Sequence, residues 1–98
     1  MPVTKLIAVK EFCNHHRIDQ ELILAFESRK LIALVKEKRS YYIPRPELPL
    51  AEKLVRLYNH LGINLEGLEV VLPLLERIEK RDRELTELRR RLSFYEKQ

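Results

Sequence analysis

The chain has 98 residues, of which 35 % are charged and 45 % are apolar, with a net charge of +4 and only two glycines. This composition is typical of one small, helix-rich domain and disfavours a β-sandwich or barrel. No apolar run approaches the roughly 20 residues that a membrane span needs, and no signal-peptide hydrophobic stretch is present. The single cysteine, Cys13, cannot form an internal disulfide, so we expect a cytoplasmic location.

The first half of the chain predicts two short helices and a hairpin. Apolar residues at helical spacing place the helices at about 8–15 and 19–28, with Asp19 as the N-cap of the second. The apolar runs 31–35 and 41–43, on either side of a polar turn, predict a β-hairpin. Such a hairpin after a helix-turn-helix is the wing of a winged helix-turn-helix, so the predicted class is mainly α.

A third helix is expected from about Leu50, after an extended connection that is set by three prolines at 44, 46 and 49. Gly62 suits the left-handed end of that helix, and Asn64 suits the N-cap of the next one. These assignments divide the chain into a head, residues 1–62, and a long C-terminal helix, residues 63–98. Pro73 predicts a kink in the long helix.

The long helix carries two apolar stripes. The first should cover the core of the head and comprises Leu65, Leu68, Leu72 and Leu75. The second, which we call the seam, has heptad spacing and comprises Val71, Leu74, Ile78, Leu85, Leu88, Leu92 and Tyr95. Arg81 is its one polar break. Because an isolated helix would expose a large apolar patch, the seam favours a coiled-coil-like homodimer over a helix that folds back on its own head.

The sequence indicates neither an enzyme nor a metal protein. Cys13, His15 and His16 lie close together, but zinc needs more ligands and the only other histidine is His60. Glycine-rich phosphate loops, nucleophile elbows and zinc-protease motifs are absent from the sequence. We therefore expect no catalytic residues, no metal and no cofactor.

DNA binding is a possible function of a winged helix-turn-helix, but the sequence disfavours it. The second helix carries Asp19, Glu21 and Glu27 and no basic residue, so phosphates would be repelled. The residues that remain for DNA are one amide in this helix and the basic tip of the wing: Gln20, Lys36, Lys38 and Arg39. A solvated turn explains the wing tip equally well.

Acidic residues predict instead a surface that binds a basic protein partner. Glu66, Glu69 and Glu76 lie on one strip of the long helix, beside the stripe that covers the core. The acidic second helix adds another such face. The candidate contacts are Asp19, Glu21, Glu27, Glu66, Glu69 and Glu76, and an ordinary solvated helix surface is the alternative.

Four segments resemble the chaperone-modulator proteins of the CbpM type, which are distant relatives of the MerR-type regulators. They are residues 11–13 (Glu-Phe-Cys), 56–57 (Arg-Leu), 61–67 (Leu-Gly-Ile-Asn-Leu-Glu-Gly) and 88–96, which ends in Arg-Leu-Ser-Phe-Tyr-Glu. The resemblance implies a non-enzymatic regulator that binds the J-domain of a DnaJ-like co-chaperone and blocks its stimulation of Hsp70. A J-domain presents a basic helix, which agrees with the acidic candidates.

The same comparison weakens the rival interpretation, a MerR-like transcriptional regulator. MerR-type DNA binders usually carry Arg-x-Tyr in the second wing strand. Here Tyr41 and Ile43 occupy those two places, so the phosphate-binding arginine is missing.

Overall fold

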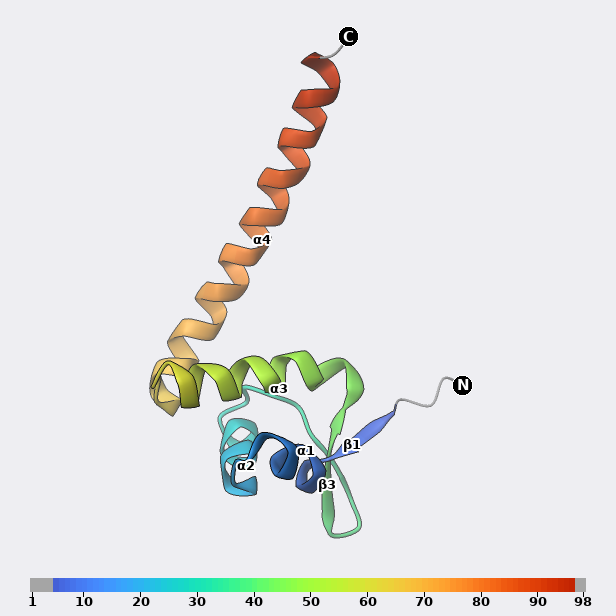
Figure 1. Ribbon diagram of the computed structural model, residues 1–98, viewed down its shortest axis with the longest axis vertical. Helices are drawn as coiled ribbons and strands as arrows, with labels where there is room; N and C mark the ends of the chain where they lie inside the picture. The colour runs from blue at the N-terminus through green and yellow to red at the C-terminus, as the bar shows by residue number, and fades with distance from the viewer. Residues whose placement is uncertain (1–4, 97–98) are drawn as a thin grey trace.

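The computed structural model describes residues 5–96 as a mainly helical chain with one small sheet (Figure 1). The elements in chain order are β1 (Leu6–Ala8), α1 (Val9–His16), α2 (Gln20–Ser28), β2 (Val35–Glu37), β3 (Ser40–Pro44), the 3-10 helix η1 (Arg45–Glu47), α3 (Leu48–Val55), the π-helical turn η2 (Arg56–His60) and α4 (Leu65–Glu96). This is the predicted winged helix-turn-helix with a long C-terminal helix.

The sheet has three antiparallel strands in the order β1-β3-β2. The hairpin β2–β3 is the wing, with Lys36 opposite Tyr41. The prediction placed its first strand at 31–35, which is wrong, because Leu31 and Ile32 are buried in the bend after α2 and belong to the core. Strand β1 was not predicted, since it is only three residues long and runs directly into α1.

One core joins the helices to the sheet. Its fully buried large side chains come from α2, β3, α3 and α4: Ile23, Phe26, Ile43, Leu54 and Leu68. The first turns of α4 are therefore part of the core of the head.

The third helix begins two residues earlier than predicted, and the expected extended connection before it is wrong. Strand β3 ends at Pro44, and the chain enters the helical turn η1 at once. Pro49 lies in the first turn of α3, where a missing backbone N–H costs nothing. The prolines thus begin a helix here rather than prevent one.

The connection from η2 to α4 is built as predicted. Gly62 has φ +69°, the left-handed conformation that glycine adopts without strain. The N–H of Gly67 donates to Asn64 Oδ1 at 2.7 Å, so Asn64 caps α4. The N–H of Ile63 donates to the carbonyl of Leu57 at 3.1 Å, which fixes the turn against the end of η2.

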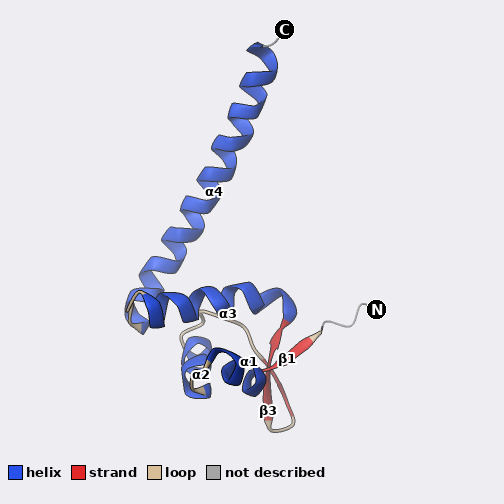
Figure 2. Cartoon of the chain, in the orientation of Figure 1, coloured by secondary structure: helices blue, strands red, loops and turns tan. Residues whose placement is uncertain are grey.

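Helix α4 leaves the head and projects away from it (Figures 1 and 2). Leu68 and Leu72 are buried, and Leu65 and Leu75 pack against the core, which confirms the first stripe. An ion pair between Lys53 Nζ and Glu79 Oε1, at 2.7 Å, ties the helix to α3. The helix does not fold back on the head, and it is unbroken through Pro73. The kink, and the division into units 1–62 and 63–98, stay predictions.

Candidate functional site

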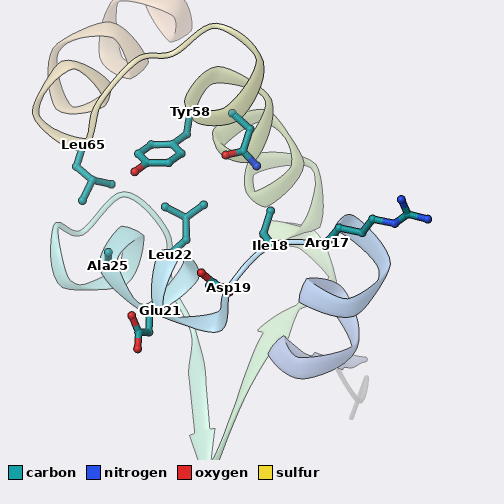
Figure 3. Close-up of a pocket in the computed structure, with 9 residues that line it drawn as sticks. Arg17, Ile18, Asp19, Glu21, Leu22, Ala25, Tyr58 and Leu65 are labelled. Atoms are coloured by element: carbon teal, nitrogen blue, oxygen red, sulfur yellow. The ribbon is translucent and has the colours of Figure 1, made fainter.

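A groove with apolar side chains on its floor and charged side chains of both signs along its edges lies between α2, η2 and the first turn of α4 (Figure 3). Its larger part has a volume of about 440 Å³, and its smaller part about 270 Å³. Tyr58 and Leu65 line both parts, and we call the two adjoining depressions together the α2–α4 groove. Its lining residues are Arg17, Ile18, Asp19, Glu21, Leu22, Ala25, Arg29, Tyr58, Asn59, Asn64, Leu65 and Glu66.

The floor of the groove consists of side chains that the core leaves half exposed. Ile23 and Phe26 take the fully buried positions of α2, so Leu22 and Ala25 lie at the border of the core. The ring of Tyr58 packs edge-on against Phe26, with a centroid distance of 6.3 Å. Figure 3 shows this ring between Leu22 and Leu65.

Three carboxylates border this floor. Asp19 occupies the predicted N-cap of α2, but its side chain makes no capping hydrogen bond. Glu21 is exposed in the first turn of α2 and points away from Tyr58, and Glu66 is exposed in the first turn of α4. The positive ends of two helix dipoles favour negative charge at these places. Arg17, at the end of the groove, points outward (Figure 3).

The other three predicted contacts lie outside this arrangement. Glu69 Oε1 accepts a hydrogen bond from Arg29 at 3.0 Å, an ion pair that ties the end of α2 to α4. Glu27 is half buried, Glu76 is exposed, and neither lines the groove. Of the six predicted contacts, Asp19 and Glu21 line the larger part of the groove, Glu66 lines the smaller part, and Glu27, Glu69 and Glu76 line neither.

Sequence reasoning missed the floor of the groove. Helical spacing assigns Leu22, Tyr58 and Leu65 to the packing of the head rather than to a binding surface. These three side chains are half exposed because of the way α2 packs against η2 and α4. No pattern in the sequence could therefore have separated them from the core.

The residues proposed for DNA lie on two separate elements. Gln20 is exposed at the start of α2, where Glu21 follows it. Lys36, Lys38 and Arg39 are exposed around the hairpin turn, and Lys36 Nζ lies 5.5 Å from the centre of the Tyr41 ring. The wing tip is thus positively charged, whereas the exposed start of α2 is negatively charged.

The histidine and cysteine cluster does not form a metal site. Within residues 5–96, His, Cys, Asp and Glu side chains nowhere gather in a group of three able to hold a metal ion. Cys13 is buried, and burial raises the pKa of its thiol. His15 is exposed, whereas His16 is half buried against Phe12, with ring centres 4.2 Å apart.

The seam is solvent-exposed along the projecting part of α4. Exposed fractions are 48 % for Leu74, 55 % for Ile78, 48 % for Leu85, 59 % for Leu88, 60 % for Leu92 and 70 % for Tyr95. Val71, nearest the head, is half buried. A monomer rarely leaves so long an apolar row in water.

Comparisons with known proteins give one match. The family described as "MerR HTH family regulatory protein" matches residues 7–90, which include nearly all of the head and most of α4. Searches of curated proteins and of solved structures return no significant match. Among the described helices, none is both long and apolar enough to cross a membrane. The chain belongs to the MerR helix-turn-helix family of regulatory proteins.

Proposed function

We propose that this protein is a regulatory adaptor that binds the J-domain of a DnaJ-like co-chaperone and inhibits its stimulation of Hsp70. The observation that carries the proposal is the α2–α4 groove, where an apolar floor is bordered by Asp19, Glu21 and Glu66. The resemblance to chaperone modulators supplies the J-domain as partner. Membership of a regulatory family agrees with a role without catalysis.

The partner element would be a basic amphipathic helix. Its apolar side chains would pack on Leu22, Tyr58 and Leu65, as in other complexes where a helix lies in a hydrophobic groove. Its lysines and arginines would face the three carboxylates at the edges. Such charge complementarity mainly raises the association rate and excludes acidic partners.

The remaining acidic candidates contribute less in this arrangement. Glu69 would have to leave Arg29 before it could bind a partner cation. Glu27 and Glu76 lie away from the floor, so their effect on a bound helix would be long-range and screened by salt.

A pair of double variants with equal changes of charge tests this assignment. Asp19→Asn with Glu66→Gln removes two carboxylates from the groove, and Asn keeps the N-cap preference of position 19. Glu27→Gln with Glu76→Gln removes two carboxylates elsewhere. Calorimetric titration against the cognate J-domain should show at least tenfold weaker binding for the first variant and less than threefold for the second. Equal effects would show that only net charge matters.

DNA binding is the second candidate, because the family includes helix-turn-helix regulators and the wing tip presents Lys36, Lys38 and Arg39. Gln20 would be the one base-reading amide on α2. Titration against duplex DNA at physiological salt separates the two functions. Sequence-selective DNA binding without detectable J-domain binding would overturn the adaptor and support the regulator of transcription.

We also propose that the seam forms a homodimer. Ile78→Asp with Leu85→Asp would place two charges among the apolar side chains of α4 without touching the head core. Sedimentation should give a dimer for the wild type and a folded monomer for this variant. An unchanged mass would reject the seam as the dimer interface.

A further inference from the structure

A second depression lies on the head where β1 and α1 meet α3, and we call it the α1–α3 pocket. Among the residues that the structure describes, none lines both this pocket and the α2–α4 groove. Its volume is about 330 Å³, near the lower end of the range for ligand pockets, so it suits one large side chain better than a whole ligand. Its lining residues are Ile7, Glu11, Phe12, His15, His16, Leu48 and Glu52.

The pocket is built mainly from side chains that lie one helical turn apart. Three pairs at four-residue spacing line it, two on α1 and one on α3: Glu11 with His15, Phe12 with His16, and Leu48 with Glu52. Residues at this spacing share one face of a helix, so each helix turns one face to the pocket. Phe12 is only 4 % exposed, and half-buried Ile7 and Leu48 pack against the same core. The floor is therefore apolar.

Aromatic rings gather on the α1 side of this floor. The ring of His16 packs against that of Phe12, and the ring of His15 meets His16 edge-on with centres 4.9 Å apart. Both histidines lie in the last turn of α1, where the negative end of the helix dipole favours a cation. A planar cation can also stack on such rings while the imidazoles are neutral.

The edges of the pocket carry negative charge. Glu11 on α1 and Glu52 on α3 are both exposed, and no described lysine or arginine lines the pocket. His16 Nε2 lies 3.9 Å from Glu52 Oε2, which is too far for a hydrogen bond. In the α2–α4 groove, by contrast, Arg29 is one of the lining residues and binds Glu69. The α1–α3 pocket thus offers its carboxylates to a cation from outside the chain.

We infer that the α1–α3 pocket binds an arginine side chain of a protein partner. A guanidinium is planar, so it stacks on the histidine rings while its fork of N–H groups donates to the carboxylates of Glu11 and Glu52. The methylene stem of the arginine covers the apolar floor. Lysine has a similar stem and the same charge, but it has neither the plane nor the fork.

The lining favours a polypeptide over free arginine as the source of this side chain. Free arginine carries an α-carboxylate, which would meet the like charges of Glu11 and Glu52 without a lysine or arginine among the described lining residues. In a polypeptide an amide replaces that carboxylate and removes the repulsion. Because the α1–α3 pocket is separate from the α2–α4 groove, the inference does not rest on the proposed binding of a J-domain.

Titration of the methyl-labelled full chain with the peptide acetyl-Leu-Arg-Leu-amide tests the site by NMR. At about pH 8 histidine is normally neutral. The methyl signals of Ile7 and Leu48 should shift, and those of Leu22 and Leu65 in the α2–α4 groove should not. Citrulline keeps the shape of arginine without its charge, so the citrulline peptide should bind about tenfold more weakly. The lysine peptide should bind about threefold more weakly, and free arginine more weakly than the arginine peptide.

Matched variants locate the charges that hold the peptide. Glu11→Gln and Glu52→Gln each remove one carboxylate from the pocket and should weaken binding about threefold. Glu66→Gln makes the same change at the α2–α4 groove and should leave the affinity unchanged.

Three results would overturn the arginine site. One is equal affinity for the arginine and citrulline peptides. Another is a shift of Leu22 and Leu65 in place of Ile7 and Leu48, with a loss in Glu66→Gln, which would locate the peptide in the α2–α4 groove. The third is no shift at about 10 mM peptide, where even a millimolar site would be mostly occupied.

Discussion

Substituting two leucines of α4 separates the stripe that packs in the head from the seam. Leu68 has no exposed surface, whereas Leu74 is 48 % exposed. Leu68→Ala removes three buried carbon atoms at about 0.8 kcal/mol each and leaves a cavity, so we expect a loss of about 3 kcal/mol. That is a large share of the 5–15 kcal/mol typical of a domain. Leu74→Ala should change the stability of a monomer by about 0.5 kcal/mol or less.

Both substitutions are best measured in the Ile78→Asp, Leu85→Asp background, because dimerisation would otherwise add to the apparent stability. Urea denaturation followed by circular dichroism gives the midpoint and the slope for each variant. In the wild-type background, Leu74→Ala should instead weaken the dimer. Equal losses from the two substitutions, or a loss below about 1 kcal/mol for Leu68→Ala, would refute the assignment of α4 to the head core.

Three further outcomes follow from individual contacts. Asn64→Ala removes the acceptor for the Gly67 N–H and should cost about 1 kcal/mol in urea denaturation, whereas Asn64→Asp should not. Cys13 should react slowly with a thiol reagent in the native protein and rapidly in urea, because it is buried and its pKa is raised; fast native labelling would contradict that burial. The hydrogen bond from Lys53 lowers the pKa of Glu79 below its ordinary value of 4.5, so the stability it adds is present above pH 4.5 and is lost as pH falls through the lowered pKa. Lys53→Met should raise that pKa in an NMR titration, and an unchanged value would show that the ion pair does not form in solution.

Local signals in the sequence were sufficient where one residue determines the backbone. Gly62 and Asn64 ended one helix and began the next where predicted, because a left-handed glycine and a side-chain cap act within one turn. The sequence also predicted the apolar stripe of Leu65, Leu68, Leu72 and Leu75, since helical spacing alone defines it. These features located the break before α4 and the face of α4 that packs on the head.

Features that depend on tertiary packing could not be predicted from the sequence. Leu31 and Ile32 have the β-propensity typical of strand residues. Their side chains are buried in the core, however, and strand β2 begins only at Val35. The prolines at 46 and 49 indicated an extended segment and instead occupy helical first turns. Likewise, charge alone gave six acidic candidates, and only the packing of α2 against η2 and α4 singled out the three that border the groove.

If the proposed partner lies in the α2–α4 groove, it would cover part of the surface that α2 would use to read DNA. A winged helix-turn-helix that reads DNA inserts its second helix into the major groove, which here means the exposed side of α2 with Gln20 and Glu21. A partner helix in the α2–α4 groove would lie against Asp19 and Glu21 and cover the start of that same helix. Any DNA binding that this chain performs would therefore be displaced by the groove partner. If the J-domain and DNA both bind, each should raise the apparent dissociation constant of the other, and simultaneous binding would show that the partner does not occupy the groove.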